Sequence, residues 1–94
     1  MPIFVVHYSY APEQAADRDR VRPDHRSWLS GLVEEGVVVS TGPLADGSGA
    51  VLLLRGDDEA AVRSVLEHDP FATAGLVASM RLAEWTPVLG VLAE

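Results

Sequence analysis

The sequence predicts an α+β fold with the element order β-α-β-β-α-β, which is the ferredoxin-like arrangement. Short runs of β-branched and aromatic residues alternate with two segments whose apolar residues recur every three or four positions. The 94 residues suffice for a single domain, residues 1–94, without a linker or an internal repeat. A hydrophobic fraction of 48% is ample for a folded chain and argues against disorder.

The first half of the chain is predicted to supply one strand and one long helix. The strand covers residues 3–10, whose β-branched and aromatic side chains favour extended structure. Residues 11–19 contain a proline and four charged residues, and a surface loop is expected there. The helix is expected to begin close to Arg22, because Pro23 is tolerated in a first turn, where its missing N–H would be unpaired. Gly36 is expected to end the helix as a left-handed cap.

The second half is predicted to supply three strands and a second helix. Asp57 or Asp58 can cap that helix, which is expected to stop near Asp69 because Pro70 disfavours helical geometry in the residue before it. The other expected elements are strands over 37–41, 50–55 and 77–86, a turn over 44–49, a helical turn over 70–75 and an apolar tail over 88–92.

The predicted sheet has too few helices to cover it. Two helices cover only one face of four strands, yet the strands are apolar on both faces, most clearly in the run 51–54. A second copy of the chain is the simplest cover for the other face. We therefore expect a homodimer packed sheet to sheet, as in dimeric α/β barrels.

The composition excludes several classes of function. The chain has no cysteine, which rules out disulfides and thiolate sites, and no lysine, which rules out a lysine Schiff base. The net charge of −7 disfavours nucleic acid as a partner. No apolar run approaches the roughly 20 residues that span a bilayer, and the first residues do not resemble a signal peptide. We expect a cytoplasmic protein with no membrane partner. Motifs for nucleotides and diagnostic spacings for a metal are absent, so no cofactor and no metal are expected.

His25 is the strongest candidate for chemistry. It is predicted at a helix start, on an apolar stripe with Trp28 and Leu29. Burial and the helix dipole would favour a neutral imidazole there, which is the form that a general base requires. A well-seated structural histidine would explain the same position. His7 is expected in the core or on the dimer face, and His68 is explained by the favourable end of the second helix.

Asp69 is the candidate partner of His25. An aspartate before a proline is a good N-cap for the turn over 70–75. The carboxylate could also accept a hydrogen bond from His25 and fix the tautomer of the imidazole. The spacing of the two residues leaves open whether they meet.

Four of the seven arginines fall within nine positions: Arg18, Arg20, Arg22 and Arg26. They are either a solvated charged segment balanced by neighbouring aspartates, or one or two of them face inward. An inward-facing guanidinium would hold an anionic ligand.

Several motifs together resemble the YciI-like (YCII-related) domain proteins over nearly the whole chain. They are Arg22-Pro23-Asp24-His25, then Gly36 with Thr41-Gly42-Pro43, then Asp69-Pro70-Phe71-Ala72-Thr73-Ala74-Gly75-Leu76. The resemblance implies a ferredoxin-like domain that dimerises through its sheet, with a His-Asp pair at His25 and Asp69. A branch of the family linked to the breakdown of chlorinated aromatics implies cofactor-independent elimination or proton transfer.

We therefore expect a small cofactor-independent enzyme of lyase, isomerase or hydrolase type, acting on a small anionic or phenolic metabolite. His25 would move the proton and Asp69 would orient it. The expected substrate-binding residues are Arg22, Arg18, Tyr8, Gly42 and Phe71. The alternatives are a non-catalytic binding or regulatory module that uses the same pocket, and a structural dimer in which the pair only stabilises the fold.

Overall fold

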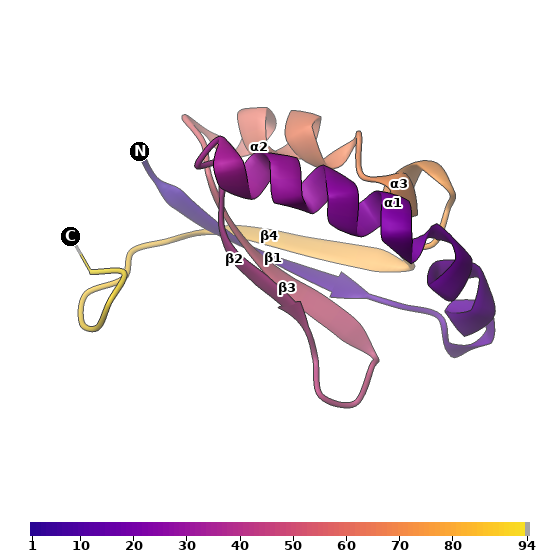
Figure 1. Ribbon diagram of the computed structural model, residues 1–94. Coiled ribbons are helices and arrows are strands. Elements are labelled where there is room, and N and C mark those ends of the chain that lie inside the picture. Colours follow the sequence, from indigo (N-terminus) through magenta and orange to yellow (C-terminus); the bar gives the residue numbers. More distant parts are fainter. Residues whose placement is uncertain (94) are drawn as a thin grey trace.

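The computed structural model describes residues 1–93 and has one antiparallel sheet of four strands with the helices on one face (Figure 1). The elements are β1 (Ile3–Ser9), η1 (Pro12–Gln14), α1 (Ala15–Glu34), β2 (Val38–Pro43), β3 (Gly49–Arg55), α2 (Glu59–Leu66), α3 (Pro70–Thr73) and β4 (Ser79–Trp85). The strand order is β2-β3-β1-β4. This is the predicted ferredoxin-like arrangement, in which α3 is the helical turn expected over 70–75 and η1 is an addition.

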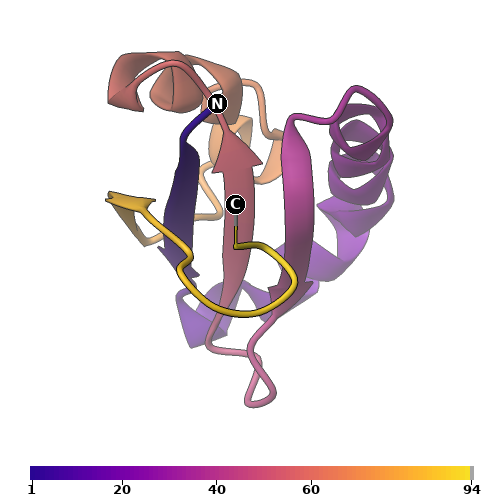
Figure 2. The ribbon, with the colours of Figure 1, turned by 90° about the vertical axis from the view of Figure 1, so that its left-hand side faces the viewer.

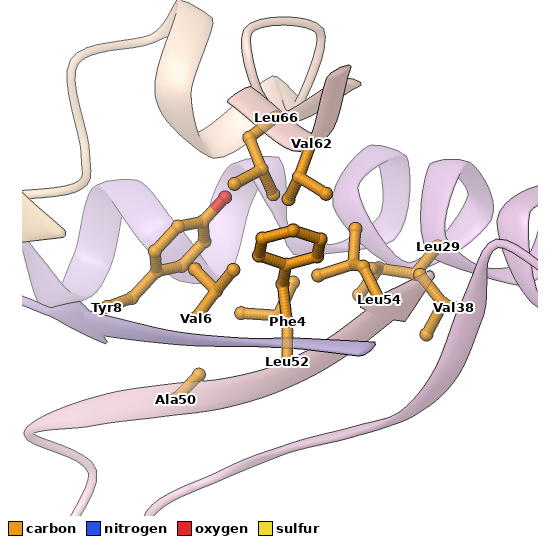
Figure 3. Packing of buried hydrophobic residues seen from close by; sticks show 10 residues of the cluster. All are labelled: Phe4, Val6, Tyr8, Leu29, Val38, Ala50, Leu52, Leu54, Val62 and Leu66. Atoms are coloured by element: carbon orange, nitrogen blue, oxygen red, sulfur yellow. The ribbon is translucent and has the colours of Figure 1, made fainter. Parts of the chain in front are cut away.

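Alternation along the central strand β1 determines which side chains enter the core. Phe4, Val6 and Tyr8 point toward the helices and are almost fully buried. The core cluster, shown in Figure 3, also contains Leu29, Val38, Ala50, Leu52, Leu54, Val62 and Leu66. The opposite face of the sheet carries Val5 and His7, which are half-buried. Among residues 1–93, no helix covers this second face (Figure 1).

The predicted loop over 11–19 and the predicted helix start near Arg22 are both wrong. The helix α1 begins at Ala15, so Pro23 lies inside it and His25 near its middle. An interior proline removes one helical hydrogen bond, and tertiary contacts offset that loss here. Arg18 is only 5% exposed, and its guanidinium donates to the Ala11 carbonyl at 2.8 Å.

The predicted caps of the two main helices are confirmed. Gly36 follows the end of α1 with a φ of 79°, a left-handed conformation that glycine adopts without steric cost. The Asp58 side chain accepts from the Ala61 N–H at 2.8 Å and so caps α2. The carboxylate satisfies one of the N–H groups that a helix start leaves unpaired.

The β2–β3 hairpin forms one edge of the sheet, and β2 is the edge strand. The strand β2 runs to Pro43, two residues beyond its predicted end, and therefore includes Gly42. It is an edge strand, in which a proline such as Pro43 is tolerated. Gly49 begins β3 at a close approach to β1. A Cβ atom there would lie 2.0 Å from the Tyr8 carbonyl oxygen, so the hairpin can pair with β1 only if residue 49 is glycine.

The tail after β4 leaves the sheet and curls in front of its end in Figure 2. Val88, Leu89 and Val91 are 77%, 91% and 100% exposed. Within residues 1–93, no helix has the length and apolarity to cross a bilayer.

The interior position of Pro23 yields a stability prediction. Pro23 is exposed, so Pro23→Ala removes no packing and restores an N–H donor for the Asp19 carbonyl. We expect the substitution to raise the free energy of unfolding by as much as about 3 kcal/mol, measured by urea titration. Ser27→Ala, an exposed substitution on the same helix, is the control and should change it by less than about 0.5 kcal/mol. A Pro23→Ala protein no more stable than the native chain would contradict the prediction.

Candidate active site

The fold brings His25 and Asp69 together, although 43 residues separate them in the sequence. His25 comes from the middle of α1, and Asp69 from the junction between α2 and α3. Nδ1 of His25 lies 2.7 Å from Oδ1 of Asp69. His25 is 8% exposed and Asp69 is fully buried. A histidine and a carboxylate are therefore in direct hydrogen-bond contact inside the protein.

Asp69 takes both of the roles that the sequence left open. Its Oδ1 also accepts from the Phe71 N–H at 2.9 Å, so the carboxylate caps α3. Its Oδ2 accepts from the Tyr8 hydroxyl at 2.7 Å. Three donors thus hold both oxygens, and a buried carboxylate is tolerated only when it is satisfied in this way.

The Tyr8 hydroxyl is a permanent donor in this arrangement. Burial, and then the negative charge of Asp69, raise the pKa of the Tyr8 phenol above its usual range. Tyr8 therefore stays protonated and donates to Asp69 at all pH values near neutrality. It supports the carboxylate from behind rather than contacting a ligand.

The orientation of the His25 ring is fixed by Phe71 as well as by Asp69. The two rings stack with centroids 3.9 Å apart and planes 3° apart. Because an ionised carboxylate only accepts, the proton on the imidazole is assigned to Nδ1. In the neutral imidazole this leaves a lone pair on Nε2. Nε2 has no hydrogen-bond partner among residues 1–93. Every fully buried side-chain nitrogen or oxygen in this part of the chain does have a partner, so Nε2 is not fully buried and is accessible.

A cavity of about 240 Å³ lies next to His25. It is bounded by α1, by the ends of β2 and β3, and by Phe71. Its lining residues are Tyr10, Arg22, His25, Arg26, Thr41, Gly42, Pro43, Ala50 and Phe71. None of them is acidic, in a chain whose net charge is −7. The cavity is therefore a positively charged region in an acidic protein.

Three of the five expected substrate-binding residues line this cavity: Arg22, Gly42 and Phe71. The other two, Arg18 and Tyr8, lie elsewhere. Arg18 is anchored on the Ala11 carbonyl and lies over the Tyr10 ring, with Cζ 4.5 Å from its centroid. Tyr8 lies behind Asp69. Its hydroxyl donates to the carboxylate, and neither Tyr8 nor Arg18 lines the cavity.

Tyr10 and Arg26 line the cavity but were not among the five expected substrate-binding residues, although Arg26 was one of the four clustered arginines considered for an anionic ligand. Arg26 follows Arg22 by four positions, a helical spacing that puts both on the side of α1 that carries His25. That signal was available in the sequence once a helix was expected there. Tyr10 follows the end of β1, and no pattern singles it out. Burial and then the nearby Asp69 charge raise the pKa of the Tyr10 phenol, against the opposing effect of Arg18 and Arg22.

The remaining histidines lie apart from this cavity. His7 is on the open face of the sheet, where it lines a shallow hollow with Arg81. His68 is exposed just after α2. The predicted start of α1 would have placed His25 at the helix dipole, and that argument fails because the residue is mid-helix. Its burial and its bond to Asp69 are what define its environment.

The family model of the YCII-related domain matches residues 3–86. The chain belongs to the YCII-related domain family. This confirms the resemblance carried by the motifs around His25 and Asp69. No match was found among curated proteins.

Solved structures are similar to this YCII-related chain along most of its length. One is 5-chloro-2-hydroxyhydroquinone dehydrochlorinase (TftG) from Burkholderia phenoliruptrix AC1100, in complex with 2,5-dihydroxybenzoquinone (TM-score 0.79, 24% identity, covering 89% of this chain and 93% of that one). A second is an antibiotic biosynthesis monooxygenase (TM-score 0.62, 14% identity, covering 95% of this chain and 100% of that one). A third is Rv0793 from Mycobacterium tuberculosis (TM-score 0.57, 17% identity, covering 99% of this chain and 100% of that one). These likenesses confirm the ferredoxin-like α+β fold.

The buried Tyr8 phenol predicts a loss of stability at high pH. An unfolded tyrosine ionises near pH 10, whereas Tyr8 in the folded YCII-related domain holds its proton to higher pH. Its contribution is complete below about pH 10 and is lost as the pH rises further, because the unfolded state then binds fewer protons. We expect the free energy of unfolding to fall above about pH 10, by up to about 1.4 kcal/mol per pH unit for this group.

The Tyr8→Phe protein should show a shallower fall in the free energy of unfolding, measured by urea titration at a series of pH values. All other titrating groups are the same in both proteins. The difference between the two slopes of unfolding free energy against pH therefore reports on the Tyr8 phenol. Equal slopes for the native and Tyr8→Phe proteins would contradict the burial argument.

Proposed function

We propose that this protein is a cofactor-independent enzyme in which His25 accepts a proton from a small anionic or phenolic substrate. Asp69 orients the imidazole and stabilises the imidazolium that forms. The observation that carries the proposal is the 2.7 Å contact between Nδ1 and Oδ1, combined with an Nε2 atom that is accessible beside the cavity. A base held in this way is ready to take a proton without reorganising.

The cavity supports a small, negatively charged substrate. Pockets for drug-sized ligands occupy about 300–1,000 Å³, so a cavity of about 240 Å³ suits a single ring or a shorter acid. Arg22 and Arg26 are the charged residues at its wall, and Phe71 supplies an apolar surface. Guanidinium groups are well matched to carboxylate and phenolate oxygens.

The reaction class is proposed from the chemistry of a lone base. Proton transfer to Nε2 leaves an electron pair on the substrate, as a phenolate or an enolate. Where a conjugated carbon bears a halide, that pair can expel the halide, and the net change is loss of HX. The likeness to a dehydrochlorinase that acts on a hydroxylated ring supports this elimination over hydrolysis. The imidazolium then returns its proton to water.

The test is chloride release from 5-chloro-2-hydroxyhydroquinone, extended to a panel of hydroxylated and carboxylated aromatic compounds. We expect His25→Ala to lower kcat/KM by about 10²–10⁴-fold, the range for positioned acid–base catalysis. Asp69→Asn keeps a good cap for α3 but can present an amide N–H to Nδ1, which disfavours the active tautomer, so a loss of the same order is expected.

His68→Ala is the matched control, because it removes an exposed histidine outside the cavity. It should leave kcat/KM unchanged. A folded His25→Ala protein with full turnover would refute the proposal. Saturable binding of the panel without any chemical change would favour the alternative, a binding or regulatory module that uses the same cavity.

We also propose that the open face of the sheet is covered by a second copy of the chain. Its side chains form cross-strand pairs, with the apolar pair Val5 and Leu53 beside His7 opposite Val51. All four are only half-buried, while the helices occupy the other face (Figure 1). Contiguous apolar surface of this kind is stabilised by burial against a partner.

A charge placed on this face should prevent the proposed dimer. We expect sedimentation velocity to give a dimer for the native chain and a monomer for Leu53→Glu. Ser64→Glu adds the same charge to the exposed side of α2 and should remain dimeric. A native chain that sediments as a monomer, or a Leu53→Glu protein that stays dimeric, would contradict this assignment of the interface.

A further inference from the structure

We propose that Arg26 is the specificity-determining residue of the cavity, and that it binds the anionic oxygen of the substrate beside the His25 imidazole. The catalytic part of this inference rests on the proposed function. The binding part does not, because it concerns only which ligand the cavity holds.

The position of Arg26 follows from the helix. Arg22, His25 and Arg26 stand at positions i, i+3 and i+4, which share one side of α1. All three line the cavity, and Thr41 and Gly42 of β2 lie on its other wall. A ligand between α1 and β2 would therefore meet the imidazole and the Arg26 guanidinium together.

The four arginines of α1 differ in whether their guanidinium groups already have partners. Arg18 donates to the Ala11 carbonyl, Arg20 pairs with Asp17 at 2.9 Å, and Arg22 pairs with Asp19. Arg26 makes no ion pair or side-chain hydrogen bond with any residue in 1–93. It is the arginine of this helix whose five donors are all available to a ligand.

The Thr41 hydroxyl at the wall does not compete for this role. The Thr41 hydroxyl already donates to the Val51 carbonyl at 3.0 Å. In the described part of the chain, no carboxylate lines the cavity to neutralise Arg26, since Asp69 lies behind the His25 ring. The cavity thus holds one uncompensated cation next to one accessible base.

This pairing defines the class of substrate. The proton to be removed and an oxygen that carries or acquires negative charge must belong to the same small ring compound, as in a hydroxylated aromatic acid or a phenol. As the proton moves to Nε2, charge grows on that oxygen, and a guanidinium already in place stabilises it without reorganisation. Arg26 would then contribute to both selection and rate.

The test compares a charged probe with a neutral one of the same shape. Benzoate and benzamide are titrated into the full chain, and binding is followed by NMR at the His25 imidazole. We expect the native protein to favour benzoate, and Arg26→Met to weaken benzoate binding by about tenfold, or about 1.4 kcal/mol, with benzamide unchanged. Arg26→Lys should keep part of the preference, because it retains the charge but loses the planar fork.

Arg20→Met is the matched control, because it removes the same charge from an ion-paired arginine of α1 that does not line the cavity. It should leave benzoate binding intact. Equal losses in Arg20→Met and Arg26→Met, equal affinity of the native protein for both probes, or no saturable benzoate binding would each overturn the inference.

The two proposals can fail separately. Benzoate binding that depends on Arg26, in a protein that turns over no substrate, would support this inference and refute the enzyme. Turnover that depends on His25 but is unchanged in Arg26→Met would do the reverse.

Discussion

The carboxylate of Asp69 is the group on which the other features of the site depend. A buried charge of this kind costs several kcal/mol unless its oxygens are bonded. Its three donors come from three different elements: the His25 imidazole from α1, the Tyr8 hydroxyl from β1 and the Phe71 N–H from α3. The carboxylate therefore connects the helical layer to the sheet, and the orientation of the imidazole follows from the packing of the whole domain.

The charges of the site are ordered in depth. The anion lies in the interior, the imidazole lies in front of it, and the guanidinium groups of Arg22 and Arg26 lie at the cavity wall. A proton that enters the imidazole moves toward a negative charge, and the electrons that it leaves behind stay near positive ones. This separation of charge favours proton abstraction from an anionic substrate over proton donation to it.

The sequence was sufficient for those features that local chemistry decides. The order of the strands, the Gly36 and Asp58 caps and the cap at Asp69 follow from short patterns. The start of α1 did not, because the contacts of Arg18 with Ala11 and Tyr10 that stabilise the helix before Pro23 are tertiary. The support of Asp69 by Tyr8 depends likewise on a contact between residues 61 positions apart, which no spacing encodes. Arg26 was recognisable by its helical spacing, but its freedom from ion pairs was not.

The double use of Asp69 has a consequence for how this domain can diverge. A residue that both begins α3 and orients His25 cannot be replaced for the sake of one task without harming the other. His25 also donates to this buried carboxylate and stacks on Phe71, but α3 keeps its cap without it. Descendants of this chain that do not use the imidazole should therefore lose the histidine before the aspartate and its proline, which still begin α3.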